Sequence, residues 1–324
     1  MNADRLKKIE DRILAGKNAS AKDAQFLANI SDQDIFDLFA AANRIRHHFQ
    51  GDSIDLCSIV NAKSGKCPED CSYCAQSTRS RARIAAYPLL EKNQVICKAE
   101  EAQKGGAKRF CIVTSGRKVS SRELLKIADM VASVKNLGLL PCATLGLLTK
   151  DDLNILKQAG LNRYHNNLET SEHFFPNICT THSYNEKKET IRSAQEAGLS
   201  VCSGGIFGLG ETWQDRIDMA FALRDLDPDS VPLNFLAPIK GTAFSGRMPL
   251  GPLEALKVIS LYRFLLPDKQ IRVCGGRIQT LGEFNPFIFL AGASGLLIGN
   301  YLTTLGRDYD DDVSLIKNLG LSVR

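Results

Sequence analysis

Residues 109–145 read RFCIVTSGRKVSSRELLKIADMVASVKNLGLLPCATL and contain two short apolar runs separated by a longer amphipathic one. Residues 109–114 and 139–145 have the apolar, β-branched composition of buried strands. Residues 121–136 repeat apolar side chains at helical spacing. A strand, a helix and a second strand in this order indicate a parallel βαβ unit, because parallel strands are joined by a helical crossover.

The same alternation continues along most of the chain. Strands are expected at 54–60, 109–114, 139–145, 163–168, 200–207, 231–236, 270–274 and 295–298, with helices at 121–136, 150–158, 185–197, 213–225 and 253–265. About eight such units predict an α/β fold, a closed (β/α)8 TIM-type barrel, with a doubly wound open sheet as the alternative. In such a barrel the chemistry lies at the carboxyl ends of the strands.

Residues 1–50 differ from the rest in having only helical signals. Ser31-Asp32-Gln33-Asp34 offers a helix cap, and the apolar residues after it recur at helical spacing until Gly51. The sequence therefore predicts an N-terminal helical extension over 1–50 and a barrel over 51–324.

Composition and charge exclude several classes of function. The 324 residues carry a net charge of +5 without any block of five or six like charges, which argues against a nucleic-acid or polybasic membrane partner. The first ten residues are mostly charged and do not resemble a secretory signal. Residues 284–306 are uncharged, but they contain Pro286 and several glycines, so a buried helix followed by a strand is expected there. These features predict a soluble, cytoplasmic protein.

Three of the ten cysteines are closely spaced. They occur in Cys67-Pro-Glu-Asp-Cys71-Ser-Tyr-Cys74, in the loop expected after the first strand. A structural zinc site would need a fourth ligand, usually from paired Cys-x2-Cys units. Three cysteines suit a cubane iron–sulfur cluster with one iron free of protein ligands. A zinc site and an accidental grouping remain alternatives at this point.

The Cys-x3-Cys-x2-Cys spacing resembles the radical S-adenosylmethionine superfamily. That resemblance implies a [4Fe–4S] cluster whose open iron chelates S-adenosylmethionine, and an electron transfer that yields a 5′-deoxyadenosyl radical. Further stretches make the chain similar to the biotin synthases along nearly its whole length. These are 109–111, 142–146, 167–168, 202–212, 231–234, Arg272 and 276–277.

The biotin synthase resemblance implies a radical sulfurtransferase that converts dethiobiotin into biotin. It implies an auxiliary cluster, often [2Fe–2S], that donates the sulfur and is held by Cys111, Cys142, Cys202 and Arg272. It also implies a flavodoxin- or ferredoxin-type electron donor and a homodimer. The alternatives are a hydrogenase-cofactor maturase or a methylornithine-type mutase of the same superfamily and, in a different class, a non-catalytic iron–sulfur electron carrier.

One residue departs from the biotin synthase pattern. Cys274 follows Arg272 by two positions, and residues i and i+2 of a strand face the same side. Thiolate is a better iron ligand than a protonated guanidinium, and four cysteines are the usual complement of a cubane. We therefore expect either a four-iron auxiliary cluster with Cys274 as fourth ligand, or a packing role for Cys274 beside Arg272 as ligand.

The remaining assignments also come from the resemblance. Tyr73 is expected against the adenine of S-adenosylmethionine, Glu169 near its ribose and Lys187 near its carboxylate. The substrate and cofactor contacts are expected from Lys63, which would meet the dethiobiotin carboxylate, and from Asn167 and Asn234.

The other features give no ligand set. The glycines of 204–210 do not match a dinucleotide fingerprint, and we expect them to let the backbone approach the cofactor. The five histidines and the cysteines Cys57, Cys97 and Cys179 show no partner pattern.

Overall fold

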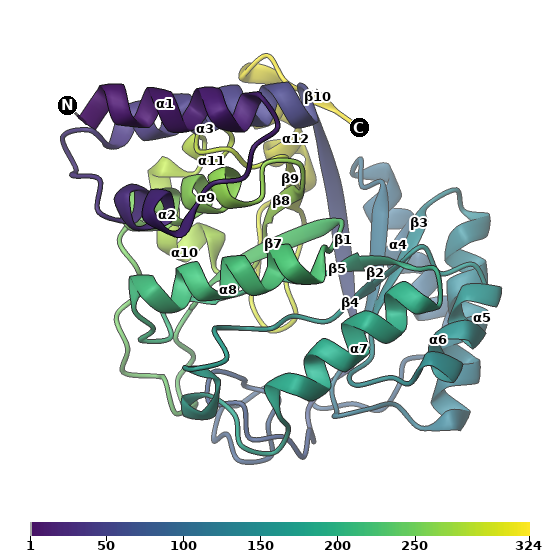
Figure 1. Cartoon of the computed structure of the whole chain (residues 1–324). Helices are drawn as coiled ribbons and strands as arrows, with labels where there is room; N and C mark the ends of the chain where they lie inside the picture. The colour runs from purple at the N-terminus through teal and green to yellow at the C-terminus, as the bar shows by residue number, and fades with distance from the viewer. Residues whose placement is uncertain (1) are drawn as a thin grey trace.

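A closed parallel barrel forms the centre of the computed structural model, which describes residues 2–324 (Figure 1). Its strands are β1 (Ser53–Lys63), β2 (Arg109–Thr114), β3 (Leu140–Thr144), β4 (Arg163–His165), β5 (Ser200–Cys202), β6 (Gly205–Phe207), β7 (Ser230–Phe235), β8 (Gln270–Val273) and β9 (Gly295–Leu297). The strands pair in parallel in the order β1, β2, β3, β4, β5, β7, β8, β9. Both β5 and the short strand β6 pair with β7. Pairing of β9 with β1 closes the ring, which confirms the predicted barrel and excludes the open sheet.

Helices follow the strands around the outside of the barrel. They are α4 (Lys92–Lys104), α5 (Ser121–Asn136), α6 (Lys150–Gln158), α7 (Tyr184–Glu196), α8 (Trp213–Leu226) and α9 (Pro252–Leu265). Four of them begin with a capping box, from Ser120, Thr149, Ser183 and Thr212, in which the cap hydroxyl and an acidic side chain three residues later bind each other's backbone amides. These local signals explain why the helix starts could be predicted closely.

Shorter elements complete the second half. They are η1 (Phe175–Asn177), α10 (Arg277–Leu281), η2 (Gly282–Phe284), α11 (Phe287–Leu290), α12 (Tyr309–Asn318) and β10 (Ser322–Val323). The uncharged segment 284–306 thus contributes α11 and β9, as expected. Within residues 2–324, none of the helices has the length and apolar character that a membrane crossing needs.

Three helices precede the barrel: α1 (Asn2–Leu14), α2 (Ala21–Ala28) and α3 (Ile35–Gln50). In Figure 1, α1 and α3 lie across the top, at the amino end of β1, and α2 lies below them at the left. Both α2 and α3 pack against α9. The long loop after β1 lies at the opposite end, at the bottom of the view. The carboxyl ends of the strands are therefore free of the N-terminal helices.

Alternation along the strands separates two cores. On β2, Phe110 and Ile112 join the large apolar core between the strands and the outer helices, whereas Cys111 and Val113 belong to a small separate cluster inside the barrel. On β8, Ile271 and Val273 likewise face outward. Because side chains of a strand alternate between its faces, the barrel interior receives every second residue.

Candidate functional site

A cavity of about 440 Å³ opens into the barrel from the carboxyl ends of the strands. The loop after β1 contributes Cys67, Cys71 and Cys74, and residues deeper in the barrel contribute further cysteines, several arginines and polar side chains. This volume lies in the range of small-molecule and cofactor sites. The cavity thus lies where the sequence predicted the chemistry to be.

The three cysteines of the loop after β1 are half-buried and have free thiols. The loop is held by its own backbone, since Cys67 N donates to Gln76 O at 3.0 Å and Cys74 N donates to Cys71 O at 3.0 Å. Burial raises the pKa values of Cys67 and Cys74. Three soft ligands on one cavity wall, without a fourth cysteine from the same loop, fit a cubane cluster with one open iron.

Polar groups beside this loop form one wall of the cavity. Glu169, four residues after the end of β4, lines the cavity and has a positive φ of 73°, which is uncommon for a residue with a side chain. Burial raises the pKa of Glu169, and its carboxylate accepts from Asn167 Nδ2 at 3.3 Å. Tyr73 and Lys187 line the same cavity. Lys187 is 8% exposed, and within residues 2–324 its amino group makes no hydrogen bond or ion pair, so it is available to an anionic ligand.

His165 lies deeper, at the end of β4. Its Nε2 lies 2.7 Å from Asn167 Oδ1, which also accepts from Gly204 N at 3.1 Å. Burial lowers the pKa of His165 to about 4, so the imidazole is neutral at physiological pH and can donate to the amide oxygen. This arrangement fixes the orientation of Asn167 in the cavity wall.

Five buried cysteines gather inside the barrel. Cys111 and Cys142 are register partners on β2 and β3, and they cluster with Cys57 and Cys274. Cys202, at the end of β5, lines the same cavity. The sequence interpretation correctly grouped four of these thiols but left Cys57 without a partner, and the structure corrects this by placing Cys57 among them.

A charged layer lies next to these thiols. The Arg272 guanidinium is paired with the buried Asp55 carboxylate, and Arg109 Nε donates to the second Asp55 oxygen at 3.1 Å. Arg163 joins through Gln270, whose Oε1 accepts from Arg163 at 2.9 Å and from Arg272 at 3.0 Å. Burial alone would raise the pKa of Asp55, but Arg272 and Arg109 hold it well below its usual value.

This layer carries three guanidinium groups and one carboxylate. The layer therefore has a net positive charge, and this buried charge would stabilise an anionic group bound next to it. A cluster held by several thiolates brings such a charge. The thiols and the arginines together therefore fit an anionic iron–sulfur centre.

Of the residues expected to contact the substrate, Asn234 lies in the cavity wall and Lys63 does not. Asn234 lines the cavity, where its amide donates to Gly205 O at 3.1 Å and accepts from Gly275 N at 2.9 Å. Lys63 is the last residue of β1 and is absent from the cavity lining. Its amino group instead bonds to Glu123 Oε1 at 2.7 Å, because the acidic side chain of the α5 capping box neutralises it there.

The glycines of 204–210 allow close packing and unusual backbone angles. A side chain on Gly204 would place Cβ 2.0 Å from the carbonyl oxygen of Pro232, and one on Gly205 would meet the carbonyl oxygen of Glu169 at 2.5 Å. Gly208 and Gly210 have positive φ values of 92° and 100°. Gly204 and Gly205 thus let neighbouring backbone segments approach each other, and their close approach to the cofactor stays a prediction.

Two residues for which the sequence indicated no partner lie next to the loop after β1. Cys179 Sγ lies 3.8 Å from Cys71 Sγ, and His182 Nδ1 lies 3.3 Å from Cys179 Sγ. The segment between η1 and α7 brings both residues to the loop after β1. Cys97 is exposed on α4 and makes no such contact.

Comparison with known proteins identifies the family. Residues 62–223 match the model of the radical SAM superfamily, and residues 232–322 match the Biotin and Thiamin Synthesis associated domain. The biotin synthase of Thermodesulfovibrio yellowstonii is 52% identical over 300 residues, covering 93% of this chain and 95% of that protein. The chain belongs to the biotin synthase family. The biotin synthase of Geotalea daltonii is also similar, with 47% identity over 98% of this chain and 97% of the relative.

Family membership makes the chain a radical S-adenosylmethionine enzyme with a [4Fe–4S] cluster. Solved structures agree in fold. Methylornithine synthase superposes with a TM-score of 0.86 at 20% identity, covering 98% of this chain and 97% of that one. A maturase of the [FeFe]-hydrogenase gives 0.84 at 16% identity, covering 99% and 76%. At such identities these likenesses concern the fold alone, whereas the full-length relatives are biotin synthases.

Proposed function

We propose that the chain inserts sulfur into dethiobiotin to form biotin, with radical chemistry initiated at one end of the cavity and sulfur supplied at the other. The observation that supports this most strongly is the presence of two separate cysteine sets along one cavity. Cys67, Cys71 and Cys74 come from the loop after β1, and the second set comes from inside the barrel. A mutase or an electron carrier has no need for the second set.

Cys67, Cys71 and Cys74 would hold the first cluster, which supplies the electron that cleaves S-adenosylmethionine when both are bound. Lys187 would bind the carboxylate of S-adenosylmethionine with its unpaired amino group. The buried Glu169 carboxylate would accept hydrogen bonds from the ribose hydroxyls. Tyr73 would pack against the adenine.

Asn167 and Asn234 would bind the ureido group of dethiobiotin and polar atoms of the cofactor. Both amides are already oriented by backbone and side-chain partners, which lowers the entropy cost of binding. Lys63 is held by Glu123, so a role at the substrate carboxylate would require it to break that ion pair.

The barrel thiols would hold the auxiliary cluster, with Cys111, Cys142 and Cys202 as three ligands and Cys274 as the fourth. Arg272 would act on its charge instead of binding iron. Its Nη1 donates to Asp55 O at 3.0 Å and to Leu296 O at 3.2 Å, and its Nη2 is engaged by the Asp55 carboxylate. Burial alone would lower the pKa of Arg272, but Asp55 together with Cys57, Cys274 and Cys202 raises it, so the guanidinium keeps its proton and offers no lone pair. Four thiolates complete the ligand set of a four-iron auxiliary cluster, and they would serve a [2Fe–2S] cluster equally well.

The family resemblance also supports a homodimer, a flavodoxin- or ferredoxin-type electron donor and a cytoplasmic location.

Transfer of labelled sulfur tests the function. The auxiliary cluster would be rebuilt with ³⁴S-sulfide under anaerobic conditions, and a single turnover run with S-adenosylmethionine, dethiobiotin and an unlabelled medium. The proposal predicts biotin that carries the label. Unlabelled biotin would place the sulfur source elsewhere, and cleavage of S-adenosylmethionine without any biotin would favour a different radical reaction.

A further inference from the structure

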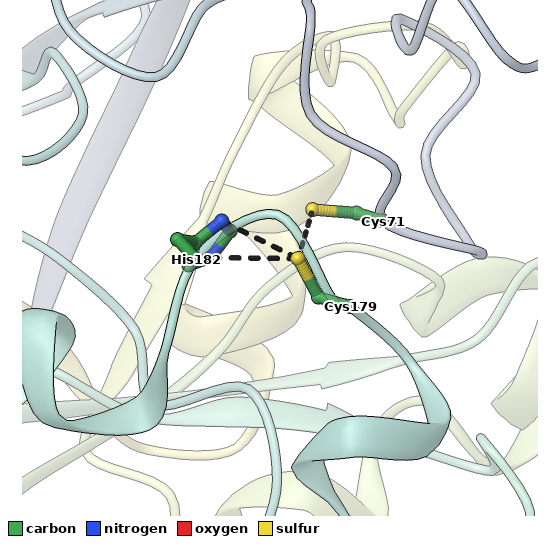
Figure 2. A group of neighbouring side chains, drawn as sticks. All are labelled: Cys71, Cys179 and His182. Atoms are coloured by element: carbon green, nitrogen blue, oxygen red, sulfur yellow. Dashed lines mark hydrogen bonds between the residues drawn. The ribbon is translucent and has the colours of Figure 1, made fainter.

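Cys71, Cys179 and His182 form a compact group of potential metal ligands where two loops meet (Figure 2). Cys71 comes from the loop after β1, and the other two come from the segment between η1 and α7. All three ligand atoms lie within 4.8 Å of one another. Cys71 and His182 line the cavity, whereas Cys179 is 5% exposed.

Two of the three distances in this group are close to the edges of a tetrahedral site. With metal–sulfur bonds of about 2.3 Å and metal–nitrogen bonds of about 2.0–2.1 Å, two sulfurs of a tetrahedron lie about 3.8 Å apart, and a sulfur and a nitrogen about 3.5 Å apart. The Sγ atoms of Cys71 and Cys179 are separated by 3.8 Å. Nε2 of His182 lies 3.8 Å from Cys179 Sγ. A cation could therefore enter with only small side-chain movements.

The orientation of His182 also suits a ligand. Its Nδ1 makes a short contact with a carboxylate oxygen of Glu69, and both side chains are buried. Donation of the Nδ1 proton to Glu69 leaves the lone pair on Nε2. Metal-bound histidines generally donate their other ring N–H to a carboxylate in this way, which fixes the ring and strengthens the ligand.

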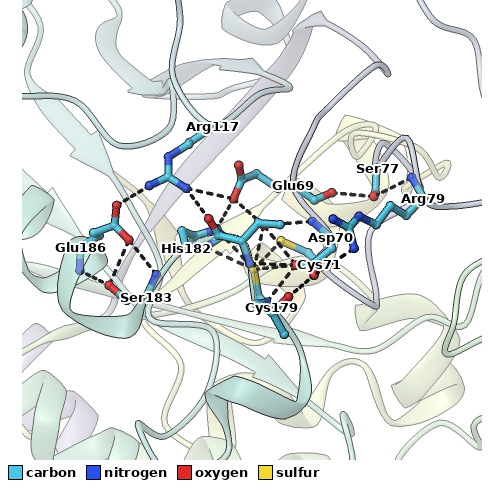
Figure 3. Close-up of polar contacts among 12 residues, drawn as sticks. Glu69, Asp70, Cys71, Ser77, Arg79, Arg117, Cys179, His182, Ser183 and Glu186 are labelled. Carbon is cyan, nitrogen blue, oxygen red and sulfur yellow. Dashed lines mark hydrogen bonds and ion pairs between the residues drawn. The ribbon is translucent and has the colours of Figure 1, made fainter.

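The two loops are tied together independently of any cation (Figure 3). Asp70 accepts from the backbone amides of Thr180 at 2.9 Å and Thr181 at 3.2 Å. Arg117 bonds to the carbonyl oxygen of Thr181 and to Glu186 at the start of α7. These hydrogen bonds hold the two loops together without using the ligand atoms, whereas the Cys179 thiol also donates to Asp70 Oδ1 at 3.3 Å, a bond that it gives up on binding a cation.

We propose that Cys71, Cys179 and His182 form a binding site for one thiophilic divalent cation, such as Fe²⁺, Co²⁺ or Zn²⁺, when no iron–sulfur cluster occupies Cys71. Two thiolates and an imidazole suit this class of cation, and solvent completes the tetrahedron. Each thiol that binds releases its proton to solvent, so no redox step is involved. The site rests on the geometry alone and does not depend on the reaction proposed above.

Because the proposed cation and the iron–sulfur cluster both need Cys71, they cannot be bound at the same time. A cation held here must release Cys71 before that sulfur can bind a cluster iron. In a newly made chain, the site would hold one Fe²⁺ next to Cys67 and Cys74 and would release it there as the cluster forms. Cys67 and Cys74, the other two cysteines of the loop after β1, are not needed for this first binding step. This independence distinguishes the proposed site from the three-cysteine motif.

Co²⁺ titration of the full-length chain, stripped of its clusters under anaerobic conditions, tests the site. The readouts are the number of equivalents that resist a competing chelator and the visible spectrum of tetrahedral thiolate-bound Co²⁺. We expect Cys71→Ala and Cys179→Ala each to lose one equivalent relative to the wild type. Cys67→Ala and Cys74→Ala should keep that equivalent, as should Cys97→Ala, which removes an exposed thiol.

His182→Gln keeps all ten thiols, and we expect it to bind the cation at least about tenfold more weakly with an altered spectrum. Unchanged stoichiometry and spectrum in both Cys179→Ala and His182→Gln would overturn the proposal. Loss of the same equivalent in Cys67→Ala would also overturn it, because the ligands would then be the cluster cysteines. Reconstitution of the first cluster in Cys179→Ala checks that this variant is folded.

Discussion

The guanidinium of Arg272 and the carboxylate of Asp55 form a buried ion pair inside the barrel, next to the cysteines. Both side chains are about 4% exposed or less. A side chain on Gly295 would meet the guanidinium carbon at 3.2 Å, so this glycine makes room for the pair. The guanidinium of Arg272 already donates to Asp55 and to backbone carbonyl oxygens. This supports a role in balancing the charge of the auxiliary cluster instead of a role as iron ligand.

The first prediction concerns this pair. Arg272→Ala leaves the Asp55 carboxylate with Arg109 as its remaining partner, and we expect it to lower the free energy of unfolding by about 3–5 kcal/mol. Asp55→Asn alone should also lower stability, because it takes the carboxylate away from both Arg272 and Arg109. The double variant Arg272→Ala/Asp55→Asn should lose less than the sum of the two single losses, because the interaction within the pair is removed only once. Anaerobic denaturant unfolding of the three variants and the wild type measures the difference, and additive losses would show that the two side chains do not interact.

The second prediction separates Cys274 from Cys57. Cys274→Ser should remove at least about one auxiliary iron per chain and change the Mössbauer spectrum of that cluster, because a thiolate ligand is lost. Cys57→Ser is the matched control, because Cys57 is a buried thiol of the same cluster of side chains but is not one of the four proposed ligands. Iron loss in Cys57→Ser alone would make Cys57 the fourth ligand.

Much of the fold was predictable because its signals are local. The βαβ alternation reproduced β2, α5 and α6 to the residue, since Ser120 and Thr149 start their helices with capping boxes that the sequence displays. The first cysteine set was predictable for the same reason, because all three members lie within eight residues. The inward direction of Cys111, Cys142 and Cys274 followed from strand alternation and barrel closure.

The parts that sequence reasoning missed depend on contacts between distant segments. Cys71 and Cys179 are 108 positions apart, and only the packing of two loops joins them. Lys63 pairs with Glu123, which also serves as a capping residue, and its expected contact with the substrate carboxylate stays a prediction. A family pattern cannot show such a competing partner. The inward direction of Cys57 could have been found by applying the alternation rule to β1.

The third prediction concerns Lys187. Lys187→Met should raise the KM or Kd for S-adenosylmethionine about 10–100-fold, because a charge-assisted hydrogen bond to the carboxylate contributes about 1.5–3 kcal/mol. Lys187→Arg should restore most of the affinity. Lys188→Met is the control on the same helix, since Lys188 lies 3.6 Å from Glu172 and is absent from the cavity lining. Equal affinities of Lys187→Met and the wild type would exclude this contact.

The fourth prediction concerns His165 and pH. Its folded pKa of about 4 lies below the ordinary value of 6.5, so the unfolded chain binds a proton that the folded chain does not. Stability should therefore fall as pH decreases from 6.5 toward 4, by about 2 kcal/mol between pH 7 and 5 from this group alone. Denaturant unfolding of cluster-free wild type and His165→Gln at these two pH values measures it. The wild type should lose about 2 kcal/mol more than the variant, and identical losses would contradict the assignment.

The central claim is that radical generation and sulfur donation use two separate cysteine sets in one barrel. The most direct test measures 5′-deoxyadenosine and biotin in the same anaerobic single-turnover reaction for Cys71→Ala, Cys142→Ala and the exposed-thiol control Cys97→Ala. We predict that Cys71→Ala forms neither product, that Cys142→Ala forms 5′-deoxyadenosine but no biotin, and that Cys97→Ala forms both. Biotin formation at the wild-type level by Cys142→Ala, or normal 5′-deoxyadenosine formation by Cys71→Ala, would contradict the account.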